Sequence, residues 1–113
     1  MSLMDILYFL IAIATIATGL VALIRPRSIT GFIGLQAPGG RGISELRSIF
    51  GGTFLGLGIA PLLLGDPAYT MLGLTYALIG AARAISILID RSTENSNIIS
   101  LVVEILFAVI LLI

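Results

Sequence analysis

The 113-residue chain contains no cysteine and no histidine, and only 11% of its residues are charged. These absences exclude disulfides, thiol chemistry and metal or haem ligation by those side chains, and they remove the most frequent general base. The six basic residues are all arginine and are balanced by six acidic residues, so no basic tract indicates nucleic-acid binding. We therefore expect no catalytic residue, no metal site and no nucleic-acid partner, and the nature of any cofactor stays unknown.

What the chain has in abundance is apolar sequence. Hydrophobic residues make up 58% of it and the mean hydropathy is +1.19. A soluble domain of this size needs more polar surface, so we expect an integral membrane protein in contact with the lipid bilayer. The apolar runs lack the alternation of a β-barrel strand, which leaves helices as the spanning elements. The sequence predicts one all-α domain over residues 1–113, a bundle of four transmembrane helices at about 3–25, 43–65, 67–90 and 97–113, with an interfacial loop at 26–42.

The arginines predict the orientation of this bundle. Four of them flank the first loop (Arg25, Arg27, Arg41 and Arg47) and Arg91 lies in the third, whereas the middle turn has only Asp66. By the positive-inside rule, the first and third loops are cytoplasmic and both termini are outside. The start of the chain is acidic, unlike a secretory signal, so the first helix is expected to be retained. The expected location is the cytoplasmic (inner) membrane, which the chain crosses several times.

Two charges lie well inside the third and fourth predicted helices, where an ionisable residue is costly and is a candidate for function. Arg83 comes seven residues before Asp90, the expected inner end of the third helix, and Glu104 comes seven residues after Asn97, the expected start of the fourth. Seven residues correspond to about 10 Å of helix, so the two charges lie at one depth on antiparallel neighbours. The sequence predicts an ion pair between Arg83 and Glu104.

Further polar residues are expected around this pair. Glu45 and Arg47 lie about 200° apart on a regular helix, and we expect the deeper Arg47 to face the bundle while the other charge reaches the interface. The predicted cluster thus joins Arg47 to the ion pair, with Glu45 and Asp90 at its inner edge and Tyr76 two turns nearer the midplane. This cluster either only fixes the helix register or also forms a ligand or ion site, and the sequence leaves both open.

Glycines on the second and third helices are interpreted as packing positions. They are Gly51, Gly52, Gly56, Gly58 and Gly80. The spacing Gly52-x-x-x-Gly56 is typical of helices that approach closely in membranes. Pro61 predicts a kink in the second helix.

The run Glu45-x-Arg47-x-x-x-Gly51-Gly52, together with the two later charges, resembles a bacterial family of small four-helix membrane proteins of unknown function, which is distantly similar to the DoxX-like proteins. The family pattern often has a glycine after the aspartate that corresponds to Asp90, where this chain has Arg91. The resemblance implies a four-helix bundle and no established activity.

Three functions are compatible with these features. The first is an accessory or structural subunit of a larger membrane complex, in which the charge cluster holds the bundle together. The alternative is a bundle-internal site that binds or transports a small anionic or lipid-like ligand, in a homo-oligomer. An intramembrane enzyme is the least favoured, because no nucleophile–base pair or carboxylate metal cluster is evident.

Overall fold

The computed structural model describes all 113 residues, and every regular element in it is a helix. Four helical stretches are long and apolar enough to cross a membrane: α1 (Leu3–Ile24), a composite helix over Gly39–Leu64, α5 (Asp66–Asp90) and α6 (Asn95–Leu112). The composite helix consists of α3 (Gly39–Glu45), a π-helical segment η2 (Leu46–Gly52) and α4 (Thr53–Leu64). The protein is therefore an all-helical protein with four candidate membrane spans.

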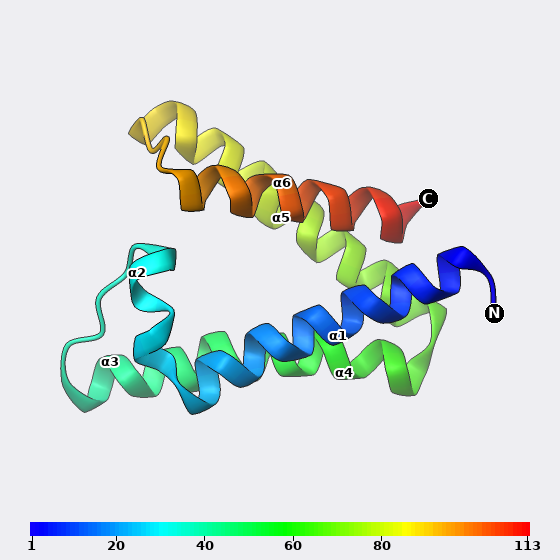
Figure 1. Cartoon of the computed structure of the whole chain (residues 1–113), viewed down its shortest axis with the longest axis horizontal. Helices are drawn as coiled ribbons and strands as arrows, with labels where there is room; N and C mark the ends of the chain where they lie inside the picture. Colours follow the sequence, from blue (N-terminus) through cyan, green and yellow to red (C-terminus); the bar gives the residue numbers. More distant parts are fainter.

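The predicted loop at 26–42 contains more structure than expected. It holds a short 3₁₀ helix η1 (Pro26–Ser28) and the single-turn helix α2 (Thr30–Ile33), and the second long helix already begins at Gly39. Figure 1 shows α2 lying between the end of α1 and the start of α6, and α2 contacts α6. This loop thus packs across one end of the bundle.

The helix ends follow local chemistry. Ser2 and Asp5 form a capping box at the start of α1, in which each side chain accepts a hydrogen bond from the other residue's backbone N–H. Pro26 follows the end of α1, since proline cannot continue the hydrogen-bond ladder. Gly65, with φ of 80°, separates α4 from α5, and Arg91, with φ of 54°, ends α5 in the left-handed conformation. Arg91 thus occupies the position where the resembling family often has glycine.

The four long helices form two antiparallel pairs. The composite helix packs along α1, and α6 packs along α5. Figure 1 shows both termini at one end of the molecule and the two pairs diverging toward the other end, where α1 and α5 finish. The molecule is flat, with extents of 44 × 31 × 17 Å.

The apolar core lies near the end that carries the termini. It consists of Ile11, Leu72, Tyr76, Ala108 and Leu111, which come from α1, α5 and α6. A tilted contact between Tyr8 and Tyr69, with ring centroids 5.2 Å apart, adds to it. The two helix pairs are therefore joined mainly at this end.

Close backbone approach joins α1 to the composite helix. A Cβ atom on Gly19 would lie 2.8 Å from the carbonyl oxygen of Gly51, and one on Gly58 would lie 2.8 Å from the backbone nitrogen of Ile16. Real Cβ atoms essentially never come this close, so any larger residue at these positions must move a backbone. Small residues at membrane helix interfaces allow this packing. The packing roles predicted for Gly51 and Gly58 agree with these distances.

The other predicted packing glycines, Gly52, Gly56 and Gly80, are not in such close contact. Cβ atoms on Gly52 and Gly56 would meet nothing within 4 Å, so the expected Gly52-x-x-x-Gly56 contact is wrong within this chain. Both residues lie on the exposed face of the helix, away from α1. Gly80 makes only ordinary contacts, because its Cβ would lie 3.6 Å or more from side chains of α6. Gly73, which was not predicted, is tighter, with Leu111 Cβ at 2.8 Å.

Gly58 and Gly56 offer a matched test of this packing. We expect Gly58→Ala to push α1 and α4 apart and to lower the free energy of unfolding by about 1–3 kcal/mol, the usual cost of overpacking. Gly56→Ala adds the same methyl group to an open face and should leave stability unchanged or slightly raised. Thermal unfolding of both variants in detergent micelles measures the difference. Equal melting temperatures for the two variants would contradict the packing.

Candidate functional site

The predicted ion pair between Arg83 and Glu104 is present and links α5 to α6. Arg83 Nε donates to Glu104 Oε1 and Arg83 Nη2 donates to Glu104 Oε2, both at 2.7 Å. This fork-to-fork arrangement of a guanidinium and a carboxylate is the strongest geometry available to such a pair. The two side chains therefore join the helices in a defined register.

A third bond extends the pair toward the turn between the helices. Arg83 Nη1 donates to Asn97 Oδ1 at 2.8 Å, and the amide nitrogen of Asn97 donates to the Ser92 carbonyl and hydroxyl oxygens at 3.1 and 2.9 Å. We call Arg83, Glu104, Asn97 and Ser92 the hairpin network. It runs from the interior of α5 and α6 to the turn after Asp90, so it ties the whole α5–α6 hairpin together.

Within the hairpin network, all three nitrogens of the Arg83 guanidinium have partners. Glu104 is buried, with 8% of its surface exposed, and no buried side-chain nitrogen or oxygen atom in the chain lacks a hydrogen bond. In a low-dielectric interior, a charge pair is tolerated when its geometry is good and its remaining polar atoms are satisfied. The hairpin network meets that condition with groups of its own chain.

Tyr76 lies away from the charges, in the apolar core. Its hydroxyl is 2.6 Å from Thr15 Oγ1 on α1, and its ring meets Phe107 edge-on, with centroids 5.2 Å apart. The single hydroxyl proton of Thr15 goes to the Ile11 carbonyl at 2.8 Å, so Tyr76 donates to Thr15. Tyr76 thus connects the hairpin to α1.

Arg47 does not join the pair, which corrects the expectation from a regular helix. On a regular α-helix Arg47 shares a face with Gly51, four residues later. In the π-helical η2 segment the hydrogen bonds run from i to i+5. The residue one turn before Gly51, on the same face of the helix, is therefore Leu46. Leu46 and Gly51 are the buried residues of this segment, and Arg47 is exposed. The wider π-helical turn therefore places Leu46 on the buried face of the helix and Arg47 on the exposed face.

The two acidic residues expected at the inner edge of the cluster are engaged elsewhere. Glu45 pairs with Arg41, one helical turn earlier, on the exposed surface. Asp90 accepts a hydrogen bond of 2.7 Å from the Ser86 hydroxyl and is also exposed. The predicted six-residue cluster therefore divides into the Arg83–Glu104 pair, the Tyr76 contact and separate surface groups.

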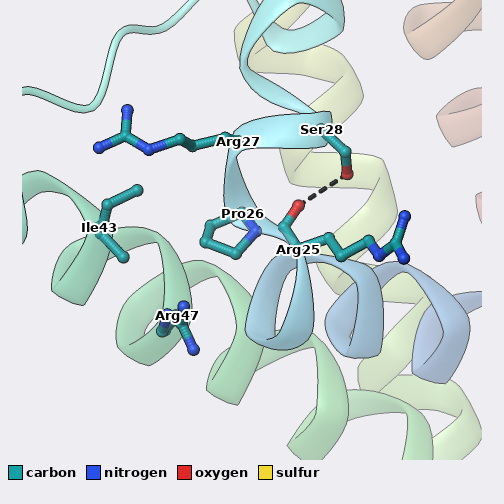
Figure 2. Close-up of a pocket in the computed structure, with 6 residues that line it drawn as sticks. All are labelled: Arg25, Pro26, Arg27, Ser28, Ile43 and Arg47. Carbon is teal, nitrogen blue, oxygen red and sulfur yellow. Dashed lines mark hydrogen bonds between the residues drawn. The ribbon is translucent and has the colours of Figure 1, made fainter.

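Arg47 lies instead in a second polar region, at the end of α1. An open pocket there is lined by Arg25, Pro26, Arg27, Ser28, Ile43 and Arg47, and we call it the arginine pocket. Figure 2 shows the side chains of Arg25 and Arg27 extending in opposite directions from the η1 turn, with Arg47 on the neighbouring helix. The Ser28 hydroxyl donates to the Arg25 carbonyl at 2.6 Å and stabilises this turn.

Two features of these regions were not predicted from the sequence. Thr15 was missed as the partner of Tyr76, although a hydroxyl residue in the middle of an apolar run was a usable signal. The shared pocket of Arg25, Arg27 and Arg47 was missed as well, because the place of Arg47 beside it depends on the π-helical turn. The chain has no group of three or more acidic residues that could hold a metal ion.

The fold and the buried polar contacts define the chain as a small helical protein with four candidate membrane spans. A family model described as "Domain of unknown function (DUF4345)" matches residues 3–113. The chain belongs to this family. Comparison with curated proteins and with solved structures gives no match.

The contact between Thr15 and Tyr76 predicts an asymmetric response to mutation. Tyr76→Phe removes the donor, and Thr15 keeps its bond to the Ile11 carbonyl, so the expected loss is about 0.6 kcal/mol, the average for such bonds in membranes. Thr15→Val leaves the buried Tyr76 hydroxyl without an acceptor and should cost more, about 1–3 kcal/mol. Chemical unfolding in micelles compares the two. A larger loss for Tyr76→Phe than for Thr15→Val would contradict the assigned bond.

Proposed function

We propose that the protein is an accessory or structural subunit of a larger membrane complex, and that the hairpin network serves to hold its helices together. One observation carries this proposal. All three guanidinium nitrogens of Arg83 are bonded to Glu104 and Asn97 of the same chain. A ligand that used Arg83 would have to displace a bidentate carboxylate in a low-dielectric setting, which is unfavourable.

The division of the predicted cluster supports the same proposal. A bundle-internal site for an anion needs a second inward cation beside Arg83, and Arg47 was the candidate. Arg47 is exposed and lines the arginine pocket instead. The bundle-internal binding or transport site is therefore the less favoured function.

The outer surfaces favour a protein that is surrounded on all sides by apolar material. Only 18 of the 113 residues are buried, and large apolar side chains are exposed on all four long helices. Lipid covers such surfaces, and so does a partner helix. We propose an inner-membrane location in a bacterium, with the arginine-rich end in the cytoplasm and both termini outside, because five arginines lie in or next to the two connections at that end. A distant relation to DoxX-like proteins belongs to the same proposal.

Native mass spectrometry of the untagged protein, extracted gently from its own membrane, tests the subunit proposal. We expect it to co-purify with a defined larger complex. Glu104→Gln should reduce that assembly strongly, because it removes the negative charge and one of the two oxygens that accept from Arg83, which loosens the α5–α6 hairpin. Glu45→Gln is the matched control, since it removes a carboxylate from an exposed pair worth less than about 1 kcal/mol and should assemble normally.

Two results would contradict the subunit proposal. One is a free monomer or homo-oligomer in the wild-type extract that carries a constant additional mass, which Arg83→Gln releases. That result would favour the bundle-internal ligand site. The other is a Glu104→Gln variant that assembles as well as the Glu45→Gln control.

A further inference from the structure

The arginine pocket is an open depression of about 520 Å³ between the end of α1 and the composite helix. Three of its six lining residues are arginines, and none is acidic. The ion pairs of the chain involve Arg41 with Glu45 and Arg83 with Glu104. Arg25, Arg27 and Arg47 have no carboxylate partner. Arg27 Nη1 donates one long hydrogen bond, of 3.4 Å, to the Ala37 carbonyl, which does not neutralise its charge, so the pocket carries uncompensated positive charge.

Local backbone structure places the three arginines around one pocket. Arg25 and Arg27 flank Pro26, which stops α1 and starts the 3₁₀ turn. Arg47 reaches the pocket because the π-helical segment turns Leu46, rather than Arg47, toward α1. Single π-helical turns within α-helices occur frequently at functional sites. Without a counter-ion, like charges repel, and Figure 2 shows the Arg25 and Arg27 guanidinium groups directed apart.

The position of the pocket indicates which anion it meets. It directly follows α1, whose 22 apolar residues are long enough to cross the hydrocarbon core of a bilayer. If α1 spans the membrane, the pocket lies near the phosphate groups. Large exposed apolar side chains flank it in sequence: Ile24 is 65% exposed and Ile49 is 64% exposed. Phe32 and Leu35, in the segment that continues from η1, are also more than half exposed. A lipid can use the apolar residues and the arginines together, whereas a free anion uses only the arginines.

We propose that the arginine pocket is a binding site for the phosphate group of an anionic phospholipid. Arg27 and Arg47 donate hydrogen bonds to the phosphate oxygens, for which the planar guanidinium is well suited, and Arg25 adds positive charge. Basic pockets between membrane helices on the cytoplasmic side recognise anionic headgroups in this way. The site is independent of the hairpin network and of any partner complex.

The proposal differs from the simpler role of these arginines as determinants of topology. The orientation of the chain depends on how many positive charges its short loops carry, and it does not depend on whether those arginines line a pocket. Lipid binding, in contrast, depends on the arginines that line the pocket. Arg41, on α3, and Arg91, directly after α5, are exposed arginines at the same end that do not line the pocket. Replacing these two removes the same number of positive charges and serves as the control.

Native mass spectrometry of the purified protein in detergent, titrated with phosphatidylglycerol or phosphatidylcholine, measures the binding. We expect wild-type protein to retain phosphatidylglycerol in preference to phosphatidylcholine. Arg27→Gln with Arg47→Gln should weaken phosphatidylglycerol binding at least about tenfold, since each arginine near a lipid phosphate contributes substantially. The control pair, Arg41→Gln with Arg91→Gln, should change it less than about twofold. Arg27→Lys with Arg47→Lys keeps the charge and should bind with intermediate affinity, which also covers the case in which the neutral variant fails to fold.

Each contrary outcome overturns the proposal. Equal weakening by the pocket pair and the control pair would mean that only net surface charge attracts the lipid. Equal retention of phosphatidylcholine and phosphatidylglycerol would remove the charge requirement. Displacement of phosphatidylglycerol by millimolar inorganic phosphate would identify the site as one for free phosphate. Unweakened binding by the lysine variant would show that the guanidinium geometry has no role.

Discussion

A charge in the interior of a membrane helix requires a partner, and in this chain Arg83 finds one in Glu104. The bidentate bond sets the register of α5 against α6, and Asn97 carries the network on to the turn that connects them. Removing one partner of such a pair leaves the other charge without its partner in a low-dielectric setting, which is destabilising. Polar bonds thus add to the close packing of α5 against α6, whereas α1 and the composite helix are held by close backbone contact. Tyr76 joins these two halves through Thr15.

The second constraint is the π-helical turn at the start of the second span. It gives Gly51 and Leu46 the buried face and turns Arg47 outward, away from the hairpin network and into the arginine pocket. The polar groups of the protein are therefore divided between two sites. One lies in the interior and its charges are balanced. The other lies at the arginine-rich end, and its charge is uncompensated. This division favours a structural role for the first site and leaves the second free to meet an external anion.

The sequence predicted the helical class and the Arg83–Glu104 pair, because both follow from apolar length and from counting residues along antiparallel neighbours. The packing roles of Gly51 and Gly58 agreed with the structure because residues seven apart share a helix face. Errors began where the helix departs from regular geometry. Arg47 was placed inward because a periodicity of 3.6 residues was assumed, and five-residue spacing cannot be read from composition. The partners of Glu45 and Asp90 were missed because exposed acidic residues have several neighbours within reach.

Exchange of the two charges tests the central claim most directly. If the pair serves only to join α5 and α6, Arg83→Glu combined with Glu104→Arg should regain much of the stability that each single variant loses, when thermal unfolding is measured in micelles. The account predicts a double variant clearly more stable than either single variant. It predicts incomplete recovery, because the bond between Arg83 and Asn97 is lost. A double variant as unstable as the singles would contradict a pairing role and would mean that one of these residues has a function that its partner cannot replace.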